Sequence, residues 1–261
     1  MPKSSYTRLP AILKNAILER LLSIRTTHPS LQAAAFLDLD GTLIEGDITE
    51  GKRNGKRPYV GLLDLAILGA YIEGYSGVDG LKAFWKKYKE DFHKPEDADL
   101  WTATLIAKVR SPEDRNWKEF VKHHLSELVS QYLFEFTRDL FAFFSEHNIA
   151  PYVISASSHD FVQELHHCLP IPEENLFGLN GRIHNGELVD KIVHDGTGKE
   201  QRLKDLCSQR KLFPLFAMGN KWRWDGMMIR QACEQGGVGL LVNEGAPSNY
   251  THRSLFYFPI A

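Results

Sequence analysis

Short apolar runs recur along the chain, and each ends in a small or polar residue, as buried strands do. The runs cover residues 33–37, 151–154, 215–218 and 238–242, and helix-like segments such as 161–167 and 200–206 lie between them. Strands that alternate with helices are typical of a mainly parallel sheet. The pattern therefore predicts an α/β fold with a Rossmann-like sheet core, whose ligand site lies at the carboxyl ends of the strands.

About a hundred residues between the first two predicted strands have helical periodicity instead. Apolar and aromatic side chains recur at helical spacing over residues 60–71, 80–92, 99–109 and 117–145. This stretch is too long for one crossover, so we expect a helical cap subdomain over residues 47–148, inserted into a core of residues 32–46 and 149–261. Its aromatic residues are expected to form the core of the cap. Two Asn-Gly pairs within residues 176–190 predict a small hairpin.

The N-terminal arm, residues 1–31, carries one amphipathic segment. Leu9, Ile12, Leu13, Ile17, Leu21 and Ile24 recur at helical spacing, and Pro10 suits a first helical turn. A helix that docks on the protein's own core is the favoured interpretation, and a helix that binds a partner or a membrane surface is the alternative.

Composition narrows the classes of partner. The chain has 261 residues, 43% of them hydrophobic, and a formal net charge of -2, so no global field attracts nucleic acid or an anionic membrane. The three cysteines, Cys168, Cys207 and Cys233, are widely spaced and form no CxxC pair, which argues against a disulfide framework and favours a reducing compartment. With no apolar run of membrane-spanning length, we expect a cytoplasmic protein.

Residues 36–43, FLDLDGTL, place two aspartates at the end of the first apolar run. Side chains two apart on an extended backbone point to the same side, so Asp38 and Asp40 both face the expected crevice. Gly41 permits a sharp turn, and Thr42 is expected to satisfy backbone groups there. Because no lysine or arginine lies in this stretch to neutralise two buried carboxylates, a bound divalent cation is predicted.

Four stretches together resemble the motifs of one family. Residues 38–43 are similar to the first motif of the haloacid dehalogenase-like hydrolases, and the spacing of the later signals resembles the phosphoserine phosphatase-like branch. Residues 154–157 resemble the second motif, Lys199 in residues 196–200 the third, and residues 217–225 the fourth. The likeness covers residues 34–46 and 149–245, and the helical insert occupies the place of the family's cap.

The resemblance implies a phosphatase that hydrolyses a small phosphomonoester through an aspartyl-phosphate intermediate. Asp38 would be the nucleophile, and Asp40 would protonate the leaving alcohol and then activate water. Ser155, Ala156 at the same strand end, and Lys199 would hold the phosphate. The expected partner is a small phosphorylated metabolite.

The resemblance also implies a Mg²⁺ site formed by Asp38, Asp40, Asn220 and Asp225. The fourth motif departs from the family here, because the family places an acidic residue directly after the glycine and another about four positions later. This chain has Asn220 and then Asp225, one step further. Asparagine offers a carbonyl oxygen but no charge, so weaker metal binding is expected. Which of the two residues touches the metal stays open.

Two other functions remain alternatives. Asn220 is compatible with a phosphate- or metabolite-binding protein of low turnover, and the same nucleophile would serve a phosphotransferase. A purely structural role, in which Asp38 and Asp40 only cap a strand, explains one motif but not four in order.

Two further groups of residues invite a functional interpretation. The basic run at residues 52–57 is interpreted as a solvated loop in preference to an anion clamp. The adjacent pairs His123-His124 and His166-His167 are interpreted as surface or helix-end residues, because neighbours on a helix point about a hundred degrees apart.

Overall fold

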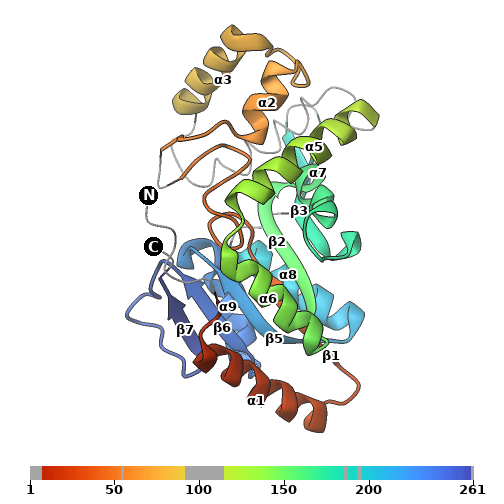
Figure 1. Ribbon diagram of the computed structural model, residues 1–261, viewed down its shortest axis with the longest axis vertical. Coiled ribbons are helices and arrows are strands. Elements are labelled where there is room, and N and C mark those ends of the chain that lie inside the picture. Colours follow the sequence, from red (N-terminus) through yellow and green to blue (C-terminus); the bar gives the residue numbers. More distant parts are fainter. Residues whose placement is uncertain (1–7, 54–55, 92–114, 185–186, 193–195, 260–261) are drawn as a thin grey trace. The chain divides into compact units, whose positions relative to one another are not determined.

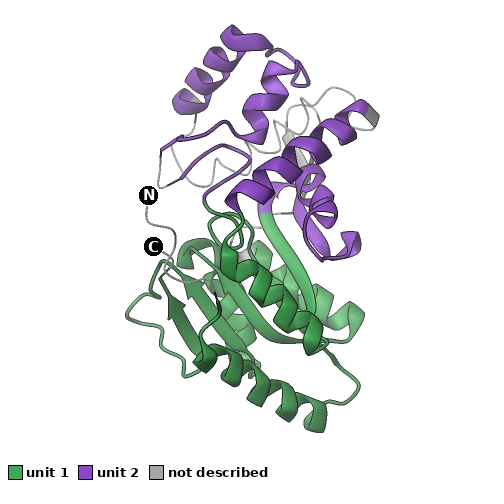
Figure 2. Ribbon diagram, viewed as in Figure 1, with its two compact units in different colours: residues 1–45, 133–155, 194–261 green, residues 46–132, 156–193 purple. Residues whose placement is uncertain are grey.

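The computed structural model describes residues 8–53, 56–91, 115–184, 187–192 and 196–259. The chain divides into two compact units (Figure 2). Unit 1 comprises residues 1–45, 133–155 and 194–261, and unit 2 comprises residues 46–132 and 156–193. Each unit is therefore assembled from segments that are far apart in the sequence.

Unit 1 is built on a parallel sheet, which confirms the predicted α/β fold (Figure 1). Its strands follow the order β2-β1-β5-β6-β7, and every neighbouring pair is parallel. The strands are β1 (Gln32–Leu37), β2 (Ala150–Ser158, which continues into unit 2), β5 (Leu212–Gly219), β6 (Val238–Val242) and β7 (Leu255–Phe258). The four predicted strands are all present, and β7 is an addition at the edge.

Helices cover both faces of this sheet. Figure 1 shows α1 (Ala11–Thr27) and α6 (Glu135–Glu146) over one face, and α8 (Gly196–Arg210) and α9 (Trp222–Glu234) over the other. β1 and β5 are completely buried apart from Gln32, because they lie between these two layers. A doubly covered parallel sheet explains why these strands read as continuous apolar runs in the sequence.

The predicted N-terminal helix docks on its own core. Leu13, Ile17, Leu21 and Ile24 of α1 are buried, whereas Ile12 is 68% exposed and lies off the packed face. The carboxylate of Asp139 in α6 fixes the start of the helix. It accepts hydrogen bonds from Lys14 Nζ (3.0 Å) and from the main-chain N–H of Leu9 (2.9 Å).

Unit 2 is mainly helical. It contains α2 (Leu62–Leu68), α3 (Gly77–Asp91), α5 (Arg115–Tyr132), the short helices α7 (His159–Gln163), η1 (Glu164–His167) and η2 (Glu173–Asn175), and the strands β3 (Leu176–His184) and β4 (Glu187–Ile192). β3 and β4 pair antiparallel, which confirms the predicted hairpin. The helix expected over residues 99–109 lies outside the described residues.

Aromatic side chains form much of the core of unit 2, as expected. Phe84 is completely buried, Trp117 is 1% exposed, and Trp85, Tyr88 and Phe161 are each at most 9% exposed. Trp85 makes edge contacts with Phe84 and Tyr88, with ring centroids 5.1 Å apart in both cases. These rings therefore stabilise the unit by packing on one another.

The boundary of unit 2 differs from that of the predicted cap. The helix expected over residues 117–145 is interrupted at residues 133–134, where Leu133 bridges to Ile44 and the N–H of Phe134 donates to Leu43 O (3.1 Å). α6 follows this break and belongs to unit 1, because its buried phenylalanines pack against the sheet. The ring centroids of Phe144 and of Phe216 in β5 are 5.9 Å apart. Residues 156–193, assigned to the core from sequence, group with unit 2.

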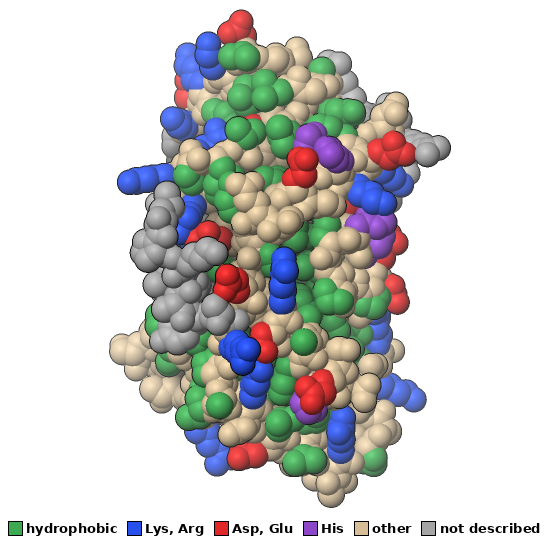
Figure 3. Space-filling model, in the orientation of Figure 1, with side chains coloured by type: hydrophobic (Ala, Val, Ile, Leu, Met, Phe, Trp, Pro, Cys, Tyr) green, Lys and Arg blue, Asp and Glu red, His purple; other side chains and the backbone are tan. Residues whose placement is uncertain are grey.

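Charged side chains of both signs are scattered over the face shown in Figure 3 and form no patch of one sign there. None of the helices in the described ranges combines the length and the apolar character needed to cross a membrane.

Candidate active site

A tight turn follows β1 and carries the first motif. The N–H of Asp38 donates to Met218 O of β5 (2.9 Å), and the N–H of Leu43 returns to Leu39 O (2.9 Å). Gly41 has φ of +72°, and a Cβ at this position would lie 1.9 Å from Asn220 Nδ2. Only glycine avoids both the left-handed strain and this contact. The turn therefore holds the first and fourth motifs against each other.

The N-terminal end of α6 anchors the same turn. Leu43 O accepts one hydrogen bond from Phe134 N (3.1 Å) and another from Thr137 Oγ1 (2.9 Å). Thr137 is completely buried. No motif in the sequence marks this residue, because its role depends on a contact with a segment about a hundred positions away.

A buried ion cluster lies directly behind the turn. Lys199 Nζ lies 2.6 Å from Asp38 Oδ1 and 2.6 Å from Asp225 Oδ1, and Thr42 Oγ1 donates to Asp38 Oδ2 at 2.6 Å. All four residues are at most 6% exposed. Lys199 comes from the first turn of α8 and Asp225 from the first turn of α9. The fold thus joins residues of the first, third and fourth motifs.

Two carboxylates and one ammonium give this cluster a formal charge of -1. Burial raises the pKa of Asp38, the charge of Asp225 raises it further, and Lys199 and Thr42 oppose the rise, so that the pKa reaches about 6. Burial alone would lower the pKa of Lys199, but Asp225 and Asp38 outweigh it and raise the pKa above its usual value. Lys199 is therefore a firmly charged ammonium at neutral pH.

These contacts correct two expectations about the first motif. Asp38 is not left without a basic partner, although its own stretch contains none, since Lys199 lies 161 positions later in the chain. The hydroxyl of Thr42 bonds Asp38 and not the backbone groups of the turn.

The carboxylate of Asp225 is largely occupied by protein donors. Its Oδ2 accepts the N–H groups of Asn220 and Lys221, both at 3.0 Å, and its Oδ1 accepts from Lys199. Three of its roughly four acceptor positions are thus filled. Asp225 therefore holds the Lys199 ammonium and the turn between β5 and α9 in place. Of the two candidate metal ligands in the fourth motif, Asn220 has the freer side chain within the described residues.

The remaining predicted residues lie beyond the end of β1 and within β2. Val153 of β2 is in register with Leu37, the last residue of β1, so Ser155, which is 1% exposed, lies in the part of β2 that extends past β1. Asp40 is half-buried in the turn. Ala156 is exposed and is the first residue of the second segment of unit 2.

The donor set fits a hard cation. Within the described residues, each carboxylate oxygen of Asp38 accepts one hydrogen bond and keeps a further acceptor position. Asp40 has a main-chain carbonyl and Asn220 an amide oxygen of the kind that hard cations accept. Mg²⁺ is commonly held by one or two carboxylates, water and a substrate phosphate. Within the described residues, the carboxylates of Asp38, Asp40 and Asp225 do not gather around one point. The donor types therefore suit Mg²⁺.

The basic run at residues 52–57 is tied into unit 2. Arg57 forms an ion pair with the buried carboxylate of Asp64, which also accepts Trp85 Nε1 at 2.7 Å. Lys52 pairs with Glu50. We expected a solvated loop here, but Lys52 and Arg57 are paired with acidic side chains of the same unit. Because these acidic side chains neutralise them, the two residues do not form an anion clamp either.

Comparison with known proteins identifies the fold. Neither a protein-family model nor a curated protein matches the chain. Among solved structures, a protein of unknown function from Bordetella pertussis Tohama I is 13% identical, covers 83% of this chain and 92% of its own, and has a TM-score of 0.60. A conserved functionally unknown protein from Anaerococcus prevotii DSM 20548 is 14% identical, covers 91% and 86%, and has a TM-score of 0.56.

A third solved structure, a phosphoserine phosphohydrolase-like protein from Francisella tularensis subsp. tularensis SCHU S4, is 15% identical, covers 80% of this chain and 87% of its own, and has a TM-score of 0.42. Likeness at these identities concerns the fold alone. The first two structures therefore share the fold of this chain. Function must be argued from the side chains of the site.

Proposed function

We propose that this chain is a Mg²⁺-dependent phosphatase that hydrolyses a small phosphomonoester through an aspartyl-phosphate intermediate. One observation carries the proposal: a buried Lys199 ammonium bridges Asp38 and Asp225 at the carboxyl ends of β1 and β5. A structural ion pair needs only one carboxylate for each lysine. Here a second carboxylate, Asp225, which two main-chain N–H groups hold in place, also accepts from the ammonium near the end of the sheet, where an anion would bind.

In the proposed reaction an oxygen of Asp38 attacks phosphorus as the ester P–O bond breaks. Asp40 donates a proton to the departing alkoxide and then takes one from the water that attacks the aspartyl-phosphate, so that inorganic phosphate leaves and Asp38 is restored. Thr42 keeps the Asp38 carboxylate in one orientation through its hydrogen bond.

Charge neutralisation is the second requirement, because a carboxylate and a phosphate dianion repel each other. Lys199 has three N–H donors, and within the described residues only two carboxylates accept from it. The third donor is directed to a phosphate oxygen, and Ser155 is assigned to another. Asp38, the Asp40 carbonyl and Asn220 would hold Mg²⁺, which supplies positive charge to the transferring phosphoryl group.

The test is hydrolysis of an aryl phosphate by the purified chain, with Mg²⁺ and with EDTA. Asp38→Asn should lower kcat by at least about 10³-fold, because an amide is not a nucleophile toward phosphorus. Asp205→Asn is the matched control, since within the described part of the chain Asp205 bonds only its helix neighbour Gln201 on α8. Equal activity of wild type and Asp38→Asn would overturn the proposal.

A phosphate- or metabolite-binding protein of low turnover is the second candidate, and Asn220 favours it. Asn220→Asp restores an acidic side chain directly after Gly219 and against Gly41. A large rise in hydrolysis would identify a site attenuated for binding, and an unchanged rate would favour a working phosphatase. Transfer of phosphate to an added alcohol in place of water would identify a phosphotransferase.

A further inference from the structure

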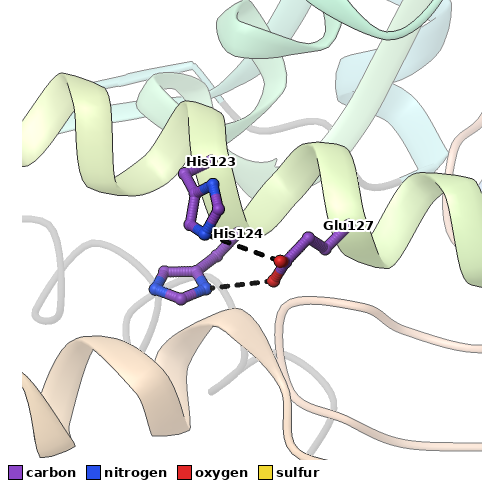
Figure 4. Close-up of side chains that lie close together, drawn as sticks. All are labelled: His123, His124 and Glu127. Carbon is purple, nitrogen blue, oxygen red and sulfur yellow. Dashed lines mark ion pairs between the residues drawn. The ribbon is translucent and has the colours of Figure 1, made fainter.

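One helix of unit 2 gathers three metal-binding side chains on its surface. On α5, His123 Nε2 lies 3.5 Å from Glu127 Oε1, and His124 Nδ1 lies 3.5 Å from Glu127 Oε2 (Figure 4). One ligand atom from each residue lies within 4.8 Å of the other two. None of these residues takes part in the proposed phosphatase site.

Helix geometry explains why an adjacent histidine pair converges on one point. Successive residues are rotated by about 100°, so Glu127 is rotated by about 40° from His123 and about 60° from His124. The glutamate therefore lies between the two rings, one turn further along α5. His123 and His124 lie on the surface of α5, as expected, and Glu127 from the next turn supplies a third ligand atom between them.

The three side chains differ in how firmly they are held. The ring of His124 packs edge-on against Phe120, with centroids 4.6 Å apart, and its side chain is 25% exposed. His123 and Glu127 are 68% and 63% exposed, so they are free to rotate and reachable from solvent. His124 is thus a partly fixed ligand toward which two mobile ligands can close.

We propose that His123, His124 and Glu127 form an exchangeable site for a divalent transition metal, with Zn²⁺ as the best match. Two imidazole nitrogens and one carboxylate form a donor set that Zn²⁺ accepts, with water completing a tetrahedron. Zn²⁺ takes ligand distances of about 2.0–2.2 Å, and the three ligand atoms already lie within 4.8 Å of one another. Mg²⁺ prefers oxygen ligands and does not compete for this site.

The measurement is Zn²⁺ titration of untagged protein against a chromophoric zinc indicator, in excess Mg²⁺ to keep the proposed phosphatase site occupied. Wild type should bind one equivalent of Zn²⁺ more than either Glu127→Gln or His124→Gln. Loss of one ligand should lower the affinity for this additional Zn²⁺ by at least about tenfold, since loss of a group that only hydrogen-bonds a metal ligand already has that effect. Co²⁺ should give the visible absorption of a nitrogen- and oxygen-ligated ion in wild type alone.

The second histidine pair provides a matched control. His167 Nε2 lies 3.4 Å from Glu164 Oε2, but His166 Nδ1 contacts the main-chain carbonyl of Gln163 at 2.8 Å. The double variant His166→Gln, His167→Gln should therefore retain the zinc equivalent. Equal zinc binding by wild type and Glu127→Gln, or loss of the equivalent in this control, would overturn the proposal, and neither result depends on phosphatase activity.

Discussion

Gly41 and Asn220 should be energetically coupled, because the turn of the first motif leaves no room for a side chain. In Gly41→Ala the new Cβ lies 1.9 Å from Asn220 Nδ2 and 3.0 Å from Asn220 Cγ, at a φ of +72°. The left-handed conformation costs about 1–2 kcal/mol for alanine. Displacing the Asn220 side chain from its rotamer adds about 1 kcal/mol. The single variant should therefore lose about 2–3 kcal/mol of unfolding free energy.

In Asn220→Ala only Cβ remains near the turn, 3.7 Å from the position that an alanine Cβ at 41 would take. Gly41→Ala should then cost only the conformational part, so the double-mutant cycle should give a coupling of about 1 kcal/mol. Urea unfolding of the four proteins, compared at an unchanged m value, measures this directly. If Gly41→Ala costs the same in both backgrounds, Asn220 does not lie over the first motif and the donor set argued for Mg²⁺ is wrong.

Three other perturbations test the remaining contacts. Thr42→Val removes the only side-chain donor to Asp38 Oδ2 within the described residues, so urea unfolding should show a loss of about 1–3 kcal/mol, and unchanged stability would contradict the bond. Asp64→Asn should lower the free energy of unfolding, measured in urea, by about 1–3 kcal/mol. The loss is smaller than for a fully buried ion pair, because the Arg57 side chain is 30% exposed. A stability equal to wild type would show that the pair contributes nothing. The pKa of Asp139 lies below its ordinary value of 3.8, because hydrogen bonds from the start of α1 outweigh the effect of burial. The stabilisation it provides is present above pH 3.8 and disappears as the pH falls through the lower folded pKa, so the stability difference from Asp139→Asn should close in acid, and a constant difference would refute the linkage.

Much of the sheet could be predicted because strands buried on both faces leave an uninterrupted apolar signal. The run at 238–242 coincides with β6, and the run at 215–218 lies inside β5. β7 was missed although Leu255–Phe258 is also an apolar run, because no helix separates it from β6 and the alternation of strands with helices does not mark it. The break between α5 and α6 could not be read from helical spacing, because it depends on the bond from Phe134 N to Leu43 O.

The site was predictable as a set of residues but not as a set of contacts. Asp38 and Lys199 were recognised from their motifs, and the structure places them 2.6 Å apart. The pairing of Lys199 with Asp225 depends on how α8 and α9 begin relative to β5. Local sequence encodes the residue types, whereas these contacts arise only when distant segments pack.

The interleaved segments of unit 1 constrain how the polypeptide is made. β1 lies between β2 and β5. Its hydrogen bonds to β5 cannot form until residues 212–219 have been synthesised and have left the ribosome. Until then the apolar residues 33–37 have no β5 partner, while every residue of unit 2 has already been synthesised. Such long-range pairing slows folding and exposes an aggregation-prone strand. The nascent chain should therefore need holding chaperones more than a protein whose sheet grows in sequence order.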